Sequence, residues 1–157
     1  MSAPRSPRTG HRTLYVWNHN AVTPAADARH HLRRALGDLN VAPESIDDAL
    51  VMASELVTNA SLYADGPYEI RMRTTMLEAI IEVRDCSLTL PSPVECVTRP
   101  LFPPRSEGCG AGSDALLAQL RERGRGLQIV HELSRGCWGM RTQPGCKIIW
   151  YAVALPG

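Results

Sequence analysis

Glu55 and Asn59 are the first residues in the chain whose types and spacing suggest chemistry. They lie in the segment ELVTNASLYA at 55–64, and in a helix they stand one turn apart on the same side. A carboxylate can act as a general base, and an amide oxygen is a hard ligand of the kind that Mg²⁺ prefers. The pair therefore suggests a site for a magnesium-bound phosphate, although it also fits the solvated face of an amphipathic helix.

A glycine-containing segment, GRGLQIV at 124–130, is a second candidate for contact with phosphate. Gly124 and Gly126 allow the backbone to approach a ligand, and the helix predicted to follow offers free N–H donors and a positive dipole end. Arg123 or Arg125 can neutralise phosphate charge, although an exposed arginine is the more common outcome in a loop. The segment therefore predicts an anion-binding helix start.

The first half of the chain predicts a strand and two helices to position these residues. LYVW at 14–17 is rich in strand formers. Apolar residues recur at helical spacing from about 24 to 39 and again from Pro43 to Ala64, and each of these helices begins with a proline, which is favoured in a first turn. On the second helix, Glu55 and Asn59 lie nearly opposite the apolar stripe.

The second half predicts strands on both sides of a long loop. Alternating apolar and polar residues indicate strands at 68–74 and 77–84, joined as a hairpin. Prolines and glycines then predict a lid loop at about 91–123. After a helix that begins near Gly124, the segments CWGMRT and KIIWYAVAL predict two strands joined at Pro144-Gly145. This order predicts an α+β two-layer sandwich, a mixed β-sheet covered on one face by helices.

The composition fits one globular domain and argues against several classes of function. The 157 residues are 44% apolar, which suits a single domain at 13–157 after a flexible basic arm at 1–12. The 17 basic and 16 acidic residues nearly cancel, so the overall charge attracts neither nucleic acid nor an anionic membrane. No segment approaches the ~20 apolar residues of a membrane span, and the polar start lacks a signal-peptide pattern. We therefore expect a cytoplasmic protein without direct contact with nucleic acid or membrane.

Taken together, these segments resemble the GHKL (histidine kinase-like) ATPase superfamily, and in particular its anti-sigma-factor serine/threonine kinases of actinobacterial type. ELVTNASLYA is similar to the N box, and EVRDCSLTLP to a strand that ends in an aspartate. A lid, the glycine box GRGLQIV and a last glycine turn in PGCKIIW follow in the order of that family. The resemblance covers residues 14–155 and implies the Bergerat ATP-binding fold, with ATP and Mg²⁺ as cofactors.

The resemblance also implies a role for each site residue. Asn59 would bind the Mg²⁺ that bridges the phosphates of ATP, and Glu55 would act as general base on an attacking hydroxyl. Asp85 would accept a hydrogen bond from the adenine amino group, although a strand-end aspartate can equally cap a turn with Ser87. The other residues expected at the nucleotide are Ser87, Arg123, Gly124, Arg125, Gly126, Leu127 and Gly145. Gly145 also fits an ordinary hairpin turn.

The implied function is that of an ATP-binding anti-sigma regulator. Such a homodimeric protein-serine kinase binds a sigma factor and phosphorylates an anti-anti-sigma partner of the STAS type. The chain departs from the usual D-x-G-x-G of the family, because Asp85 is followed by CSLT at 86–89. Cys146 also stands where a threonine is common after the last glycine. These departures leave open a second function, a GHKL-fold binding module that sequesters a regulatory partner without phosphoryl transfer.

Overall fold

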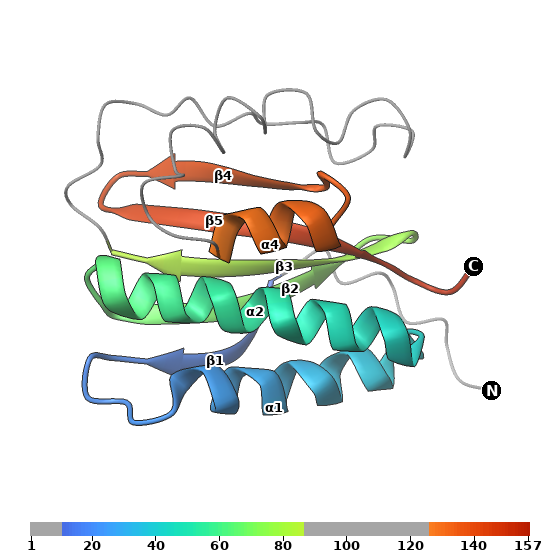
Figure 1. Ribbon diagram of the computed structural model, residues 1–157, viewed down its shortest axis with the longest axis horizontal. Helices are drawn as coiled ribbons and strands as arrows, with labels where there is room; N and C mark the ends of the chain where they lie inside the picture. Colours follow the sequence, from blue (N-terminus) through green and yellow to red (C-terminus); the bar gives the residue numbers. More distant parts are fainter. Residues whose placement is uncertain (1–10, 87–125) are drawn as a thin grey trace.

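The computed structural model describes residues 11–86 and 126–157, and in these ranges the chain forms two layers (Figure 1). The elements follow in the order β1 (Arg12–Trp17), α1 (Pro24–Asp38), α2 (Pro43–Tyr63), β2 (Tyr68–Thr74), β3 (Glu78–Asp85), α4 (Gly126–Leu133), β4 (Trp138–Gln143) and β5 (Cys146–Ala154). The strands form one sheet in the order β1-β2-β3-β5-β4. The three described helices cover one face of it. This arrangement confirms the predicted α+β two-layer sandwich.

The direction of the strands corrects one detail of the prediction, because all neighbouring strands are antiparallel and the sheet is not mixed. The chain from β3 through α4 to β4 has the order of a βαβ unit, in which two strands run parallel. β4 does run parallel to β3, since both are antiparallel to β5. However, β5 lies between them in the sheet, so the two parallel strands are not neighbours.

The observed boundaries of the helices and strands agree best with the predicted ones where a proline begins a helix. α1 and α2 begin at Pro24 and Pro43, where the fixed backbone angle of proline suits the first turn. β1 begins at Arg12, two residues earlier than predicted. The predicted lid at 91–123 and residues 1–10 of the predicted basic arm lie outside the described residues. None of the helices that the structure describes is long and apolar enough to span a bilayer.

The core lies between the helices and the sheet. Leu36 of α1 and Leu56 of α2 meet Ile70 of β2 and Ile81 of β3 there, and each of these side chains is at most 1% exposed. Met52 of α2 is also buried. α2 lies between α1 and α4 (Figure 1). Its buried surface is therefore wider than the single apolar stripe that the sequence predicted.

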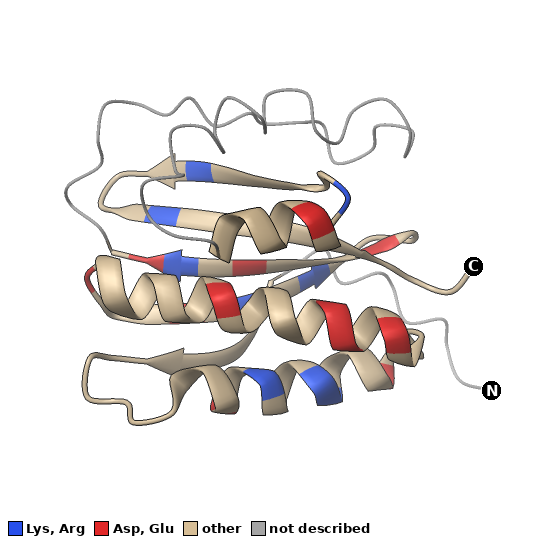
Figure 2. Cartoon of the chain, viewed as in Figure 1, with Lys and Arg blue, Asp and Glu red and all other residues tan. Residues whose placement is uncertain are grey.

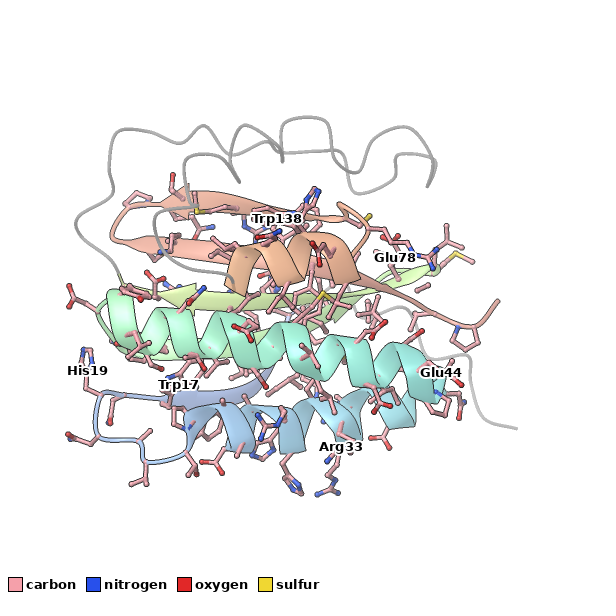
Figure 3. The ribbon with its side chains drawn as sticks, viewed as in Figure 1. Trp17, His19, Arg33, Glu44, Glu78 and Trp138 are labelled. Atoms are coloured by element: carbon pink, nitrogen blue, oxygen red, sulfur yellow. The ribbon has the colours of Figure 1, made fainter. Side chains whose placement is uncertain are left out.

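Two tryptophans tie the edge strands of the sheet to the helical layer (Figure 3). The indole Nε1 of Trp17 in β1 donates to the hydroxyl of Ser61 in α2 at 3.0 Å. The indole Nε1 of Trp138 in β4 donates to Nδ1 of His131 in α4, also at 3.0 Å. Both edges are thus held to the helices by a bulky apolar side chain whose polar atom has a partner.

On the face of the sheet that the helices leave uncovered, Glu82 of β3 is buried among arginines. Its carboxylate lies 2.7 Å from Nε of Arg71, 2.9 Å from Nη2 of Arg141 and 3.1 Å from Nε of Arg73. We call these four residues the Glu82 cluster; β2, β3 and β4, the strands that hold it, carry charged bands in Figure 2. Burial lowers the pKa of Arg73 below its ordinary value. One carboxylate, 0% exposed, therefore lies among three guanidinium groups.

Candidate functional site

Glu55 and Asn59 lie on the side of α2 that faces the start of α4, and both are partly buried. A β-carbon at Gly126 would lie 2.8 Å from Nδ2 of Asn59 and 3.1 Å from Oε2 of Glu55. The two side chains therefore converge on the first residue of α4. Both side chains therefore pack at the start of α4 and do not stand on a fully solvated helix face.

A cavity lies beside this contact, between α2, the start of α4 and the strands of the sheet. It is lined by Leu56, Asn59, Ala60, Tyr63, Val83, Asp85, Leu127, Met140, Lys147 and Ile149. Apolar walls with a few polar groups are typical of small-molecule sites. The cavity measures about 30 Å³, which holds roughly two water molecules. A purine base is larger than this cavity, so binding one requires the lining to open; Tyr63, a lining residue, is 58% exposed.

Asp85 ends β3 and is the buried carboxylate of this cavity, with an exposed fraction of 2%. Nζ of Lys147 lies 3.3 Å from its Oδ2. The two residues are register partners across β3 and β5, so their side chains stand on the same face of the sheet. Together, the carboxylate and the ammonium group can accept a hydrogen bond from a bound heterocyclic ring and donate one to it.

Lys147 was missed by the sequence analysis, which selected only Asp85 from this pair. The available signal was a lysine at the start of the otherwise apolar segment KIIWYAVAL. A buried lysine needs a charged or hydrogen-bonding partner. However, only the register between β3 and β5 identifies that partner as Asp85.

The start of α4 supplies the remaining described part of the site. Gly126 is the first residue of α4, Leu127 lines the cavity, and both are buried. The first N–H groups of a helix lack partners within the helix and suit an anionic ligand. The structure thus brings Glu55, Asn59 and Asp85 to one region with these two residues.

Of the other predicted site residues, Gly145 alone lies in the part of the chain that the structure describes. Ser87, Arg123, Gly124 and Arg125 lie outside the described residues. Gly145 lies in the turn between β4 and β5, where its φ of 74° is in the left-handed region that favours glycine. It is not among the residues that line the cavity. The turn conformation alone therefore explains a glycine at this position.

The donor set fits a magnesium-bound nucleotide. Asp85 can accept from an amino group of a base whose rings contact Leu56 and Ile149. The missing side chain of Gly126 lets Asn59 and Glu55 approach the start of α4 closely, because a β-carbon there would clash with the Asn59 amide. The amide oxygen of Asn59 is a suitable hard ligand for Mg²⁺, which commonly binds together with substrate phosphates.

Comparison with known proteins agrees with this geometry. The profile of the histidine kinase-like ATPase domain matches residues 19–152 of the chain. The matched range includes every residue that lines the cavity. No curated protein matches the chain.

Proposed function

Because the chain belongs to the histidine kinase-like ATPase domain family, whose members bind ATP, we propose that it is an ATP-dependent protein-serine kinase. In this proposal it binds a sigma factor and phosphorylates an anti-anti-sigma partner of the STAS type. The observation that carries the proposal is the position of Glu55, which contacts the start of α4 and also lines a groove between α1 and α2. The proposal further includes Mg²⁺ bound by Asn59, a homodimer and a cytoplasmic location.

The groove supports the approach of a protein substrate to Glu55. It is lined by Arg29, Arg33, Asp47, Leu50, Val51, Ser54 and Glu55. Nη1 of Arg29 donates to the hydroxyl of Ser54 at 2.8 Å, and Arg33 extends outward from α1 (Figure 3). A serine hydroxyl presented through this groove would meet Glu55, a carboxylate that also contacts the phosphate-binding side of the site.

Each described site residue has one task in the proposed reaction. ATP would supply the phosphoryl group, and a bound Mg²⁺ would neutralise phosphate charge. Asn59 would hold the metal ion through its amide oxygen, and Glu55 would accept the proton of the attacking hydroxyl. Asp85 orients the base, while the N–H groups at the start of α4 face the phosphates. Such a sparse set suffices, because positioning and charge neutralisation supply most of phosphoryl-transfer catalysis.

Thermal unfolding with and without MgATP tests the nucleotide site. A ligand at 100 times its Kd stabilises the native state by roughly 2.7 kcal/mol, which raises Tm by about 5–10 °C in a domain of this size. Asn59→Ala is expected to lose most of this shift at the same MgATP concentration, because it removes the metal ligand. Thr58→Ala is the matched control, since Thr58 is an exposed neighbour on the same helix. The absence of any shift in the wild type at millimolar MgATP would contradict the proposal.

Gly126→Ala is expected to weaken MgATP binding by about tenfold or more without unfolding the protein. The new β-carbon would lie 2.8 Å from Nδ2 of Asn59, so the amide must rotate away from its position. Alanine is otherwise the better helix former by up to about 1 kcal/mol. Titration calorimetry measures the change in MgATP affinity, and unfolding without ligand measures the change in stability. Gly37→Ala in α1 is the control, because nothing lies within 4 Å of its new β-carbon. Equal MgATP affinity of both variants would argue against a role for the Asn59 amide.

A second function is favoured by the pairing of Asp85 with Lys147. The ammonium group already contacts the carboxylate that would accept from a base, and residues 86–89 lack the glycines usual in the family. In this second function the chain is a binding module that sequesters its partner without phosphoryl transfer. Equal capture of a sigma factor with and without MgATP would support it, whereas strict dependence on MgATP would support the kinase.

A further inference from the structure

Cys86, which directly follows β3, and Cys146, the first residue of β5, are free thiols. The register of β3 and β5 pairs Asp85 with Lys147. In an antiparallel pair, the next residue of one strand faces the preceding residue of the other. Cys86 follows Asp85 and Cys146 precedes Lys147, so the same register, continued by one residue beyond β3, sets the two cysteines against each other.

Backbone hydrogen bonds show that this is a non-hydrogen-bonded position of the antiparallel pair of strands. The N–H of Cys86 donates to the carbonyl of Asp65 at 2.8 Å, on the side of β2 and away from β5. Farther along, Leu155 donates to the carbonyl of Leu77 at 2.9 Å, which assigns the odd-numbered residues of β3 to the bonded positions. Cα atoms of non-bonded pairs lie ~4.5 Å apart. Disulfides span Cα separations of about 4.4–6.8 Å, so this pair has a suitable geometry.

The surroundings of the two thiols suit oxidation. Because side chains alternate along a strand, both thiols stand on the face opposite the cavity that Asp85 and Lys147 line. Cys86 is partly exposed and Cys146 is 2% exposed. The hydrogen bond with Cys146 raises the pKa of Arg84, so the Arg84 guanidinium lies beside the Cys146 sulfur.

We propose that Cys86 and Cys146 form a redox modification site that closes to an intramolecular disulfide in the presence of a disulfide oxidant such as glutathione disulfide. The more exposed thiolate, Cys86, attacks one sulfur of the oxidant, whose S–S bond breaks to release one glutathione thiolate. The thiolate of Cys146 then attacks the sulfur of Cys86 and releases the second glutathione. One protein S–S bond forms, and the two thiol protons pass to the two departing thiolates. Two electrons reduce the oxidant.

The new bond joins β3 to β5 directly beside the Asp85 and Lys147 pair. Oxidation therefore restrains the two strand ends that carry the polar groups of the cavity. This inference rests on the register and the thiols, and it holds whether or not the protein transfers phosphate.

Peptide mapping of the full chain tests the proposal. The native protein is equilibrated in buffers of increasing glutathione disulfide, its remaining thiols are alkylated, and it is cut with trypsin. Cys86 lies in the tryptic peptide 85–105 and Cys146 in the peptide 142–147. Mass spectrometry is expected to show these two peptides linked, in an amount that rises as alkylated Cys146 falls. Wild-type protein in which both cysteines stay alkylated at every buffer ratio would overturn the proposal without any variant.

Cys96 provides the matched control, because it lies in the same tryptic peptide as Cys86. Cys86→Ser is expected to abolish the link to peptide 142–147, whereas Cys96→Ser is expected to preserve it. The reverse pattern would assign the bond to Cys96 and overturn the proposal.

Discussion

Glu82→Ala is expected to lower the free energy of unfolding by about 3–5 kcal/mol, the usual result of removing one partner from a buried ion pair. The carboxylate is 0% exposed, and its removal leaves three clustered guanidinium groups whose nearest remaining carboxylate in the described ranges is Glu69, 3.9 Å from Arg71. The total stability of a domain is about 5–15 kcal/mol. Urea unfolding followed by circular dichroism measures the loss of stability. We expect the variant to be only marginally folded.

Glu69→Ala is the control for the Glu82 cluster. Glu69 lies on the same face of the sheet, but its side chain is 21% exposed and its contacts with Arg71 and Arg84 are longer, at 3.9 Å. Pairs of this kind contribute about 1 kcal/mol or less. Equal destabilisation by the two substitutions would show that burial of the Glu82 carboxylate has no special importance.

Glu55→Gln is expected to slow phosphoryl transfer by about 10²–10⁴-fold, the usual contribution of a general base. The amide keeps the shape of the side chain and its contact with Gly126, but it cannot accept a proton. MgATP affinity is therefore expected to stay within a few-fold of the wild type. Single-turnover transfer of labelled phosphate to a STAS partner measures the rate, and titration calorimetry measures the affinity.

A second carboxylate of the same groove gives the comparison that this prediction needs. Asp47 lines the groove with Glu55 but precedes it by about two turns of α2, so Asp47→Asn is expected to preserve the transfer rate. An unchanged rate in Glu55→Gln would remove Glu55 from the mechanism. Equal loss of MgATP binding and transfer would give Glu55 a role in positioning instead.

Local sequence signals were sufficient to predict the described helices and strands. They also placed Glu55 and Asn59 on the same side of α2. Pro24 and Pro43 begin helices because proline suits a first turn. Glu55 and Asn59 share a side of α2 because the helical period is 3.6 residues, and the structure adds what they face, namely Gly126.

Contacts between distant strands could not be predicted in the same way. Lys147 meets Asp85 only through the register of β3 and β5. The alternating pattern of its strand predicts that Glu82 faces outward, into solvent. It is buried instead, because arginines from two other strands surround it, including Arg141 of β4. Likewise, the insertion of β5 between β3 and β4 is a matter of strand order, which no local pattern records.

The central position of the β3 and β5 pair also has a consequence for folding kinetics. Asp85 and Lys147 are roughly 60 positions apart in the sequence, so the chain must close a long loop before their pairing compensates the lost entropy. The hairpins β2-β3 and β4-β5 are local and need no such closure. High contact order of this kind slows folding toward milliseconds to seconds. We therefore expect the Asp85 and Lys147 pair of the cavity to be among the last parts of the molecule to form. Nucleotide binding during refolding then follows the slow pairing of β3 with β5.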